Sequence, residues 1–134
     1  MSLKRLTRED IRNLTGNFNP TGHAVLAFAD DATAEQAAQA LHAAGFTADD
    51  VLAYTGAAVK PRLQKMVDTA GEGAGFGYEI TLLRRYLVLA GEGCGWLIVY
   101  APDDDATARV TTVAVKFKAT SAVKYNRLVN EDLV

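Results

Sequence analysis

The sequence predicts an α+β domain of the ferredoxin-like plan, in which a pair of βαβ halves forms one four-stranded antiparallel sheet. Two apolar segments without polar alternation, 23–29 (HAVLAFA) and 95–101 (GWLIVYA), are typical of strands covered on both faces. The pentapeptide DDATA follows each of them, at 30–34 and at 104–108, and is suited to a helix start. Because this plan places strands one and three in the middle of the sheet, the pattern and the topology agree.

Bulk composition predicts a single folded domain. The chain has 134 residues, of which 49% are hydrophobic and 22% charged. A net charge of −2 offers no overall field for nucleic acid or an anionic membrane. Cys94 is the only cysteine, which excludes an internal disulfide and suits a reducing compartment. The first residues lack the apolar stretch of a signal peptide, so we expect a cytoplasmic protein.

Residues 1–20 are expected to form an N-terminal helical arm. In LTREDIRNLTG, Thr7 can cap a helix that has Asp10 three residues later. Leu6 and Ile11 are spaced as a hydrophobic staple. The arm is therefore expected to dock on the domain.

Residues 23–56 are expected to form the first βαβ half. The helix that begins at the first DDATA carries alanine and leucine on one face and glutamate, glutamine and histidine on the other. Gly45 is a suitable left-handed stop, and Phe46 would then contact Leu41 in a Schellman ending. VLAYT, at 51–55, predicts the second strand.

Residues 57–94 are expected to be a helical insertion between strands two and three. KPRLQKMVDTAG has Pro61 at a helix-opening position, and YEITLLRRYLVLAG predicts a longer helix after the glycine-rich GEGAGFG. Since a bare apolar sheet face would be a liability, the insertion should either cover that face or extend into a partner subunit. A doubly wound parallel sheet is the alternative, because helices between all strands would also cover both faces.

Residues 95–128 are expected to form the second βαβ half. The segment DDDATARVTTVAVKFKAT is ambiguous, because helical spacing from Ala106 onward competes with strand-like alternation from Val113 onward. The repeated pentapeptide favours a helix over 104–119. AVKYNRL then supplies the fourth strand.

Four features of the chain occur in a recognisable order. They are AVLAFADDATAEQAAQALHAAGF, the glycine-rich middle, a helix ending in glycine before WLIVYAP, and the closing AVKYNRLVNEDL. In these features, which cover most of the chain, it resembles bacterial small proteins of the general stress protein 17M type. The resemblance implies a small cytoplasmic α/β protein tied to stress, and it carries over no catalytic residue.

The acidic and glycine-rich clusters have structural interpretations. Asp30 and Asp31, and the run 103–105, offer the oxygen ligands of Mg²⁺ or Ca²⁺, but no spacing resembles a calcium loop. Capping of helix N-termini by these carboxylates is favoured. GEGAGFG and GEGCG lack the third glycine of a dinucleotide motif, so connection or close helix packing is favoured there. We therefore expect no metal and no cofactor.

If a ligand exists, the residues we expect to contact it are Arg84, Arg85 and Cys94. The arginine pair interrupts an apolar helix and could hold an anion, although such pairs more often extend to water. Cys94 with His23 or His42 could form a nucleophile and base, but no third group is evident to orient them. No catalytic residue is assigned.

The favoured function is that of a non-catalytic, cytoplasmic protein that self-associates, with a stress-related role implied by the resemblance. The alternative is a small-molecule or anion-binding sensor, or an enzyme, with its pocket between the sheet and the helix over 78–90. The two differ in the partner they predict, a second copy of the chain or a small ligand. Nucleic acid and membrane are expected to be absent as partners.

Overall fold

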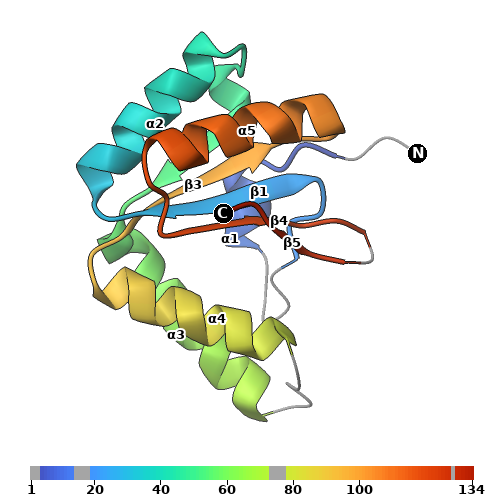
Figure 1. Ribbon diagram of the computed structural model, residues 1–134. Coiled ribbons are helices and arrows are strands. Elements are labelled where there is room, and N and C mark those ends of the chain that lie inside the picture. The colour runs from blue at the N-terminus through green and yellow to red at the C-terminus, as the bar shows by residue number, and fades with distance from the viewer. Residues whose placement is uncertain (1–3, 14–18, 73–77, 128) are drawn as a thin grey trace.

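The computed structural model describes residues 4–13, 19–72, 78–127 and 129–134. They form an antiparallel sheet between helical layers (Figure 1). The helices are α1 (Arg8–Arg12), α2 (Asp31–Ala43), α3 (Gly56–Glu72), α4 (Tyr78–Gly91) and α5 (Asp104–Lys116), with a short 3₁₀ turn η1 (Ala48–Asp50). The strands are β1 (His23–Phe28), β2 (Val51–Tyr54), β3 (Gly95–Tyr100), β4 (Ser121–Lys124) and β5 (Glu131–Asp132).

The five strands lie in the order β2-β3-β1-β4-β5. The first and third strands are neighbours inside the sheet, as expected, with His23 opposite Tyr100 and Phe28 opposite Gly95. Every strand pair is antiparallel, so the alternative of a doubly wound parallel sheet is wrong. The sequence did not predict β5, because a strand of two exposed acidic residues gives no hydrophobic alternation.

Helices α2 and α5 cover one face of the sheet, which is the upper face in Figure 1. The Asp30 carboxylate caps α2 by accepting a hydrogen bond of 2.7 Å from the backbone N–H of Thr33. At the other end Gly45 adopts a φ of 108°, and the Phe46 N–H donates to the Leu41 carbonyl at 3.1 Å. The Schellman ending predicted for this helix is therefore confirmed.

The ambiguous segment after β3 is a helix. α5 begins after Asp103, whose carboxylate accepts a hydrogen bond of 2.8 Å from the Ala106 N–H. Both pentapeptides therefore lie at helix starts, as predicted. They are shifted by one position, because Asp30 is the first residue of its copy whereas Asp103 precedes the second copy.

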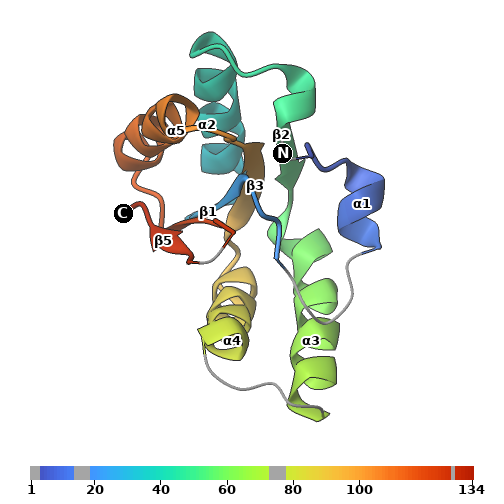
Figure 2. The ribbon, with the colours of Figure 1, turned by 90° about the vertical axis from the view of Figure 1, so that its right-hand side faces the viewer.

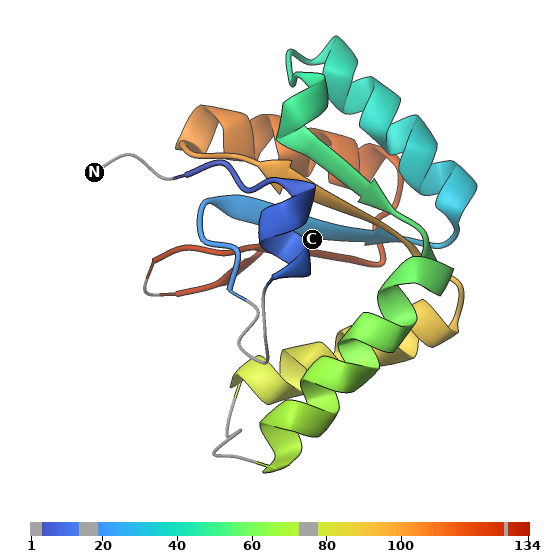
Figure 3. The same cartoon turned by 180° about the vertical axis from the view of Figure 1, so that it is seen from behind.

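Helices α3 and α4 lie side by side on the opposite face of the sheet (Figures 2 and 3). Of the two arrangements predicted for the insertion, the structure shows the first, in which its helices cover the second face of their own sheet. α3 begins earlier than expected, because the Thr55 hydroxyl accepts a hydrogen bond of 3.1 Å from the Ala58 N–H. Pro61 consequently lies inside the helix rather than at its opening. The last five residues of GEGAGFG, 73–77, lie outside the described residues.

The N-terminal arm docks beside β2, where Figure 2 shows α1. Its predicted capping box is present, since Thr7 and Asp10 exchange hydrogen bonds of 2.9 and 3.1 Å. Arg8 donates to the Ala53 carbonyl at 3.0 Å, and Ile11 is buried in the core beneath the sheet. The arm therefore shields part of the outer edge of β2.

Two glycines mark places where backbones approach closely. A Cβ added to Gly95 would lie 2.7 Å from the Cα of Asp31, and one added to Gly56 would lie 2.6 Å from the Cys94 carbonyl oxygen. No side chain fits at either position without movement of the backbone. Close packing, the interpretation favoured for GEGCG, therefore accounts for its last glycine.

Candidate functional site

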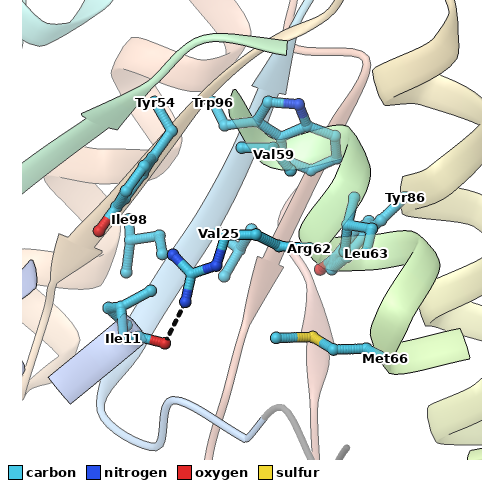
Figure 4. A pocket seen from close by; sticks show the side chains of 10 residues that line it. All are labelled: Ile11, Val25, Tyr54, Val59, Arg62, Leu63, Met66, Tyr86, Trp96 and Ile98. Atoms are coloured by element: carbon cyan, nitrogen blue, oxygen red, sulfur yellow. Dashed lines mark hydrogen bonds between the residues drawn. The ribbon is translucent and has the colours of Figure 1, made fainter. Parts of the chain in front are cut away.

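A cavity of about 50 Å³ lies between the sheet and the α3–α4 pair, and it is partly open to solvent (Figure 4). The alternative function predicted from the sequence places a pocket between the sheet and the helix over 78–90, which corresponds to α4. Among the described lining residues, α3 supplies four and α4 supplies Tyr86. The lining residues are Ile11, Val25, Tyr54, Val59, Arg62, Leu63, Met66, Tyr86, Trp96 and Ile98.

Two buried aromatic side chains form one wall of the cavity. The rings of Tyr86 and Trp96 meet edge to face, with 5.1 Å between their centroids. The Tyr86 hydroxyl is hydrogen bonded to that of Tyr125 at 2.9 Å. The indole N–H of Trp96 has no hydrogen-bond partner among the described residues, although it is buried. This wall is therefore mainly apolar, and the Trp96 N–H is a donor that no described residue uses.

Tyr54 approaches the cavity from β2. The guanidinium carbon of Arg8 lies 5.0 Å from the centre of its ring, which places a cation over the aromatic face. Its hydroxyl is buried and has no hydrogen-bond partner within the described part of the chain. Tyr54 thus brings a second unused hydrogen-bonding group to the cavity lining.

Arg62 is the one charged residue among the described residues that line the cavity. Figure 4 shows its side chain extending from α3 toward the arm, where its Nη2 donates to the Ile11 carbonyl at 2.6 Å. The side chain is partly buried, and no ion pair joins it to a carboxylate of the described residues. A guanidinium has five N–H donors, so most of its capacity to bind an anion remains unused here.

Arg109, on the opposite face of the sheet, provides a contrast. It also donates to a backbone carbonyl, that of Ala44 at 2.7 Å, and it lies over the Phe46 ring at 4.9 Å. Unlike Arg62, it has a counter-ion, because the Asp105 carboxylate lies 3.2 Å from its Nε. The two arginines therefore differ in whether a described carboxylate forms an ion pair with them.

The arginine pair predicted to contact a ligand lies elsewhere on α4. Arg84 and Arg85 are both exposed, and neither lines the cavity. Their contact with a ligand stays a prediction, and the guanidinium that lines this cavity is that of Arg62 on α3. The sequence does not identify Arg62, because the surrounding KPRLQKM has the periodicity of an amphipathic helix with a solvated face. Its contact with Ile11 of the arm forms only in the folded chain.

Cys94 is buried beside the same core but does not line the cavity. Burial, together with the negative charge of Glu92, raises the pKa of its thiol, which therefore stays protonated at neutral pH. His23 lies at the far end of β1 from Gly95, about 17 Å away along the strand. Cys94 and His23 therefore do not form a nucleophile and base pair.

The other histidine considered as a base, His42, lies near the end of α2, and its Nδ1 is 3.0 Å from the Phe46 carbonyl oxygen. The start of α2 is the end that packs on Gly95, next to Cys94. The length of the helix therefore separates His42 from the thiol. No cysteine and histidine pair exists for nucleophilic chemistry.

His23 instead holds the N-terminal arm in place. Its buried ring accepts a hydrogen bond at Nε2 from the Leu6 N–H at 3.1 Å, while Nδ1 lies 3.1 Å from the Thr21 carbonyl oxygen. This pair of contacts requires the neutral ring with its proton on Nδ1. Burial lowers the pKa of His23, and the charge of Lys124 lowers it further, against the opposing hydrogen bond to Thr21.

A second, polar hollow of about 370 Å³ lies between the arm and β2. The guanidinium of Arg5 in its wall is paired, with Nη2 3.8 Å from Asp49 Oδ2 and Nη1 3.1 Å from Asp50 Oδ1. The guanidinium of Arg8, also in its wall, lies over the Tyr54 ring and donates to the Ala53 carbonyl. The acidic clusters of the sequence cap helices, and the described residues contain no group of three or more metal-ligating side chains. The cavity beside Arg62 is therefore the strongest candidate site.

Compared with protein-family models, with curated proteins and with solved structures, the chain matches none. Within the described ranges, no helix is long and apolar enough to cross a membrane. The cavity and the residues around it are consequently the basis for inferring a function.

Proposed function

We propose that this protein is a non-catalytic binding module that holds a small, mainly apolar molecule between its sheet and the α3–α4 pair. One observation carries the proposal, the partly open cavity in a protein interior that otherwise packs to high density. A volume of about 50 Å³ has room for only about three to five water-sized groups. A larger ligand would require α3 and α4 to move apart.

We infer that the fold is ferredoxin-like, with β5 added beside β4 and the α3–α4 pair inserted as a third layer. The order β4-β1-β3-β2 within the sheet supports this interpretation. In such folds the sheet face opposite the two crossover helices is the one that nucleic-acid-binding members use. Here α3 and α4 cover that face, so an enclosed small molecule is a better fit than a macromolecule.

Self-association stays a prediction. The apolar sheet face that motivated it is covered within the chain, and the exposed Val88 and Val115 lie on opposite layers. Of the two sheet edges, β2 is shielded by Arg8 and β5 is acidic, which disfavours pairing with another sheet. The stress-related role and the cytoplasmic location implied by the family resemblance also stay predictions.

Trp96 provides a direct test, because it is the only tryptophan of the chain and lines the cavity. Titration with hexan-1-ol, butan-1-ol and benzyl alcohol should change its fluorescence saturably and raise the melting temperature. Val59→Phe, which adds bulk to the lining, should abolish the change. Val88→Phe, at an exposed site on α4, is the matched control. If no probe produced a saturable change in the unmodified protein, the binding function would be refuted.

A further inference from the structure

We infer that the natural ligand of the cavity is a small apolar monocarboxylate whose carboxylate binds the guanidinium of Arg62. This inference rests on the proposed function and narrows it to one chemical class. Three features of the site lead to it: the uncompensated charge of Arg62, the geometry of its free donors, and the apolar character and size of the remaining lining.

The charge of Arg62 is the first feature. Its side chain is partly buried against an apolar cavity, and the carbonyl of Ile11 is a neutral acceptor that leaves the positive charge in place. A buried charge without a counter-ion is costly, whereas an anion of matching geometry removes much of that cost. Arg109 shows how the same chain treats a comparable arginine, which it pairs with Asp105.

The geometry of the free donors is the second feature. With Nη2 bonded to the Ile11 carbonyl, the other N–H groups of the planar guanidinium remain available. Such a planar fork matches the two oxygens of a carboxylate and forms paired, charge-assisted hydrogen bonds. A single guanidinium balances one negative charge, so a monocarboxylate fits the site better than a doubly charged phosphate.

The rest of the lining is the third feature. Aliphatic and methionine side chains from α3 and the sheet surround the space, and Met66 is unbranched and can adjust to a ligand. Apart from Arg62, the lining contributed by the described part of the chain carries no charged residue. A ligand therefore needs one anionic end and an apolar remainder, and about 50 Å³ limits that remainder to a short chain unless the helices move.

The test compares three probes of one chain length that differ in charge: hexanoate, hexan-1-ol and hexylammonium. Trp96 fluorescence reports their binding to the intact protein. Hexanoate should bind about tenfold or more tightly than the alcohol, because hydrogen bonds to a charged partner are the stronger ones. Hexylammonium should bind most weakly, because its charge repels that of Arg62.

The variants then identify the arginine. Arg62→Gln should lower the affinity for hexanoate to that for hexan-1-ol and leave the alcohol unaffected, whereas Arg62→Lys should keep part of the preference for the acid. Arg84→Gln, an exposed arginine on the neighbouring helix, is the matched control and should change neither. Far-UV circular dichroism and the melting temperature establish that each variant is folded.

The outcomes separate this inference from the binding function. If hexan-1-ol binds but hexanoate binds no more tightly, or if Arg62→Gln leaves the preference for the acid intact, the carboxylate assignment is overturned and the apolar site stands. If none of the three probes binds the unmodified protein, both fail. Should Arg62→Gln not fold, the comparison of acid, alcohol and amine on the unmodified protein decides alone.

Discussion

The two faces of the sheet carry cores of different character. On the α2–α5 face, Leu26, Leu41 and Val110 are among many residues with no exposed surface, whereas among described residues of the α3–α4 face only Ala27 reaches that level. The first core is rich in alanine, and the second contains the aromatic wall and the cavity. One sheet can therefore be closely packed on one side while its other side keeps a cavity.

The helices, more than the strands, produce this difference. Successive residues of β3 point to opposite faces, so Leu97 joins the α2–α5 core while Trp96 joins the other. α2 presents small side chains and approaches until Gly95 touches its first residue, Asp31. α3 and α4 meet the broad surface of Trp96 with long side chains, and such irregular shapes leave a gap between them.

Truncating a leucine in each core should give the largest difference in stability between the two faces. Leu41→Ala, in the fully buried core, should lower the free energy of unfolding by about 3–5 kcal/mol, because the closely packed surroundings cannot fill the void. Leu63→Ala, which lines the existing cavity, should lower it by about 2 kcal/mol. Urea denaturation measures both. Equal losses would show that the two faces are packed alike.

A methyl group added to a glycine tests the close approach of α2. Gly95→Ala should lower the free energy of unfolding by about 1–3 kcal/mol, because its Cβ would lie 2.7 Å from the Cα of Asp31. Gly91→Ala is the control, since apart from its chain neighbours and the backbone of its own helix no atom lies within 4 Å of the added carbon. It should change stability by less than about 0.5 kcal/mol. A tolerated Gly95→Ala would contradict the tight contact.

Protonation of His23, which holds the N-terminal arm, should make the stability of the protein depend on pH. The lowered pKa of buried His23 means that unfolded chains bind a proton more readily than folded ones below the ordinary pKa of 6.5. Stability should therefore be full above that pH and fall as the pH drops below it. Protonation also removes the acceptor for the Leu6 N–H, so the arm should exchange its amide hydrogens faster.

The measurement is the melting temperature between pH 8 and pH 5, with amide hydrogen exchange over residues 6–12. His23→Gln should flatten the profile in this range, and His42→Gln, near the exposed end of α2, should leave it unchanged. An identical slope in His23→Gln would assign the pH dependence to another group.

Local signals made much of the fold predictable. Asp30 and Gly45 mark the two ends of α2, and both lie within a few residues of the helix. The continuously apolar side chains of β1 predict that it is buried on both faces. α3 was placed too late because its cap, Thr55, precedes a run of glycine and alanine without apolar periodicity. Capping and burial of single elements can therefore be found from neighbours in the sequence.

The candidate site was less predictable, because no local pattern defines it. Its lining comes from α1, α3, α4 and three strands, which the chain brings together only after folding. Arg62 became a candidate through a contact with Ile11, 51 positions earlier. Arg84 and Arg85 interrupt an apolar run of the sequence, and in the structure both are exposed on the solvent side of α4.

The smallest predicted effect is the addition of one methylene group to each face. Val25→Ile adds it beside the cavity, where it should raise the free energy of unfolding by about 0.5–1 kcal/mol by filling space. Val99→Ile adds it to the fully buried core and should lower the same quantity by about 1 kcal/mol through overpacking. Changes of opposite sign in the free energy of unfolding for the same substitution on β1 and β3 would show that the unfilled volume lies on the α3–α4 face. Val25→Ile should also weaken hexanoate binding. Two losses of similar size would mean that the cavity has no room for a methyl group, and hence none for a ligand.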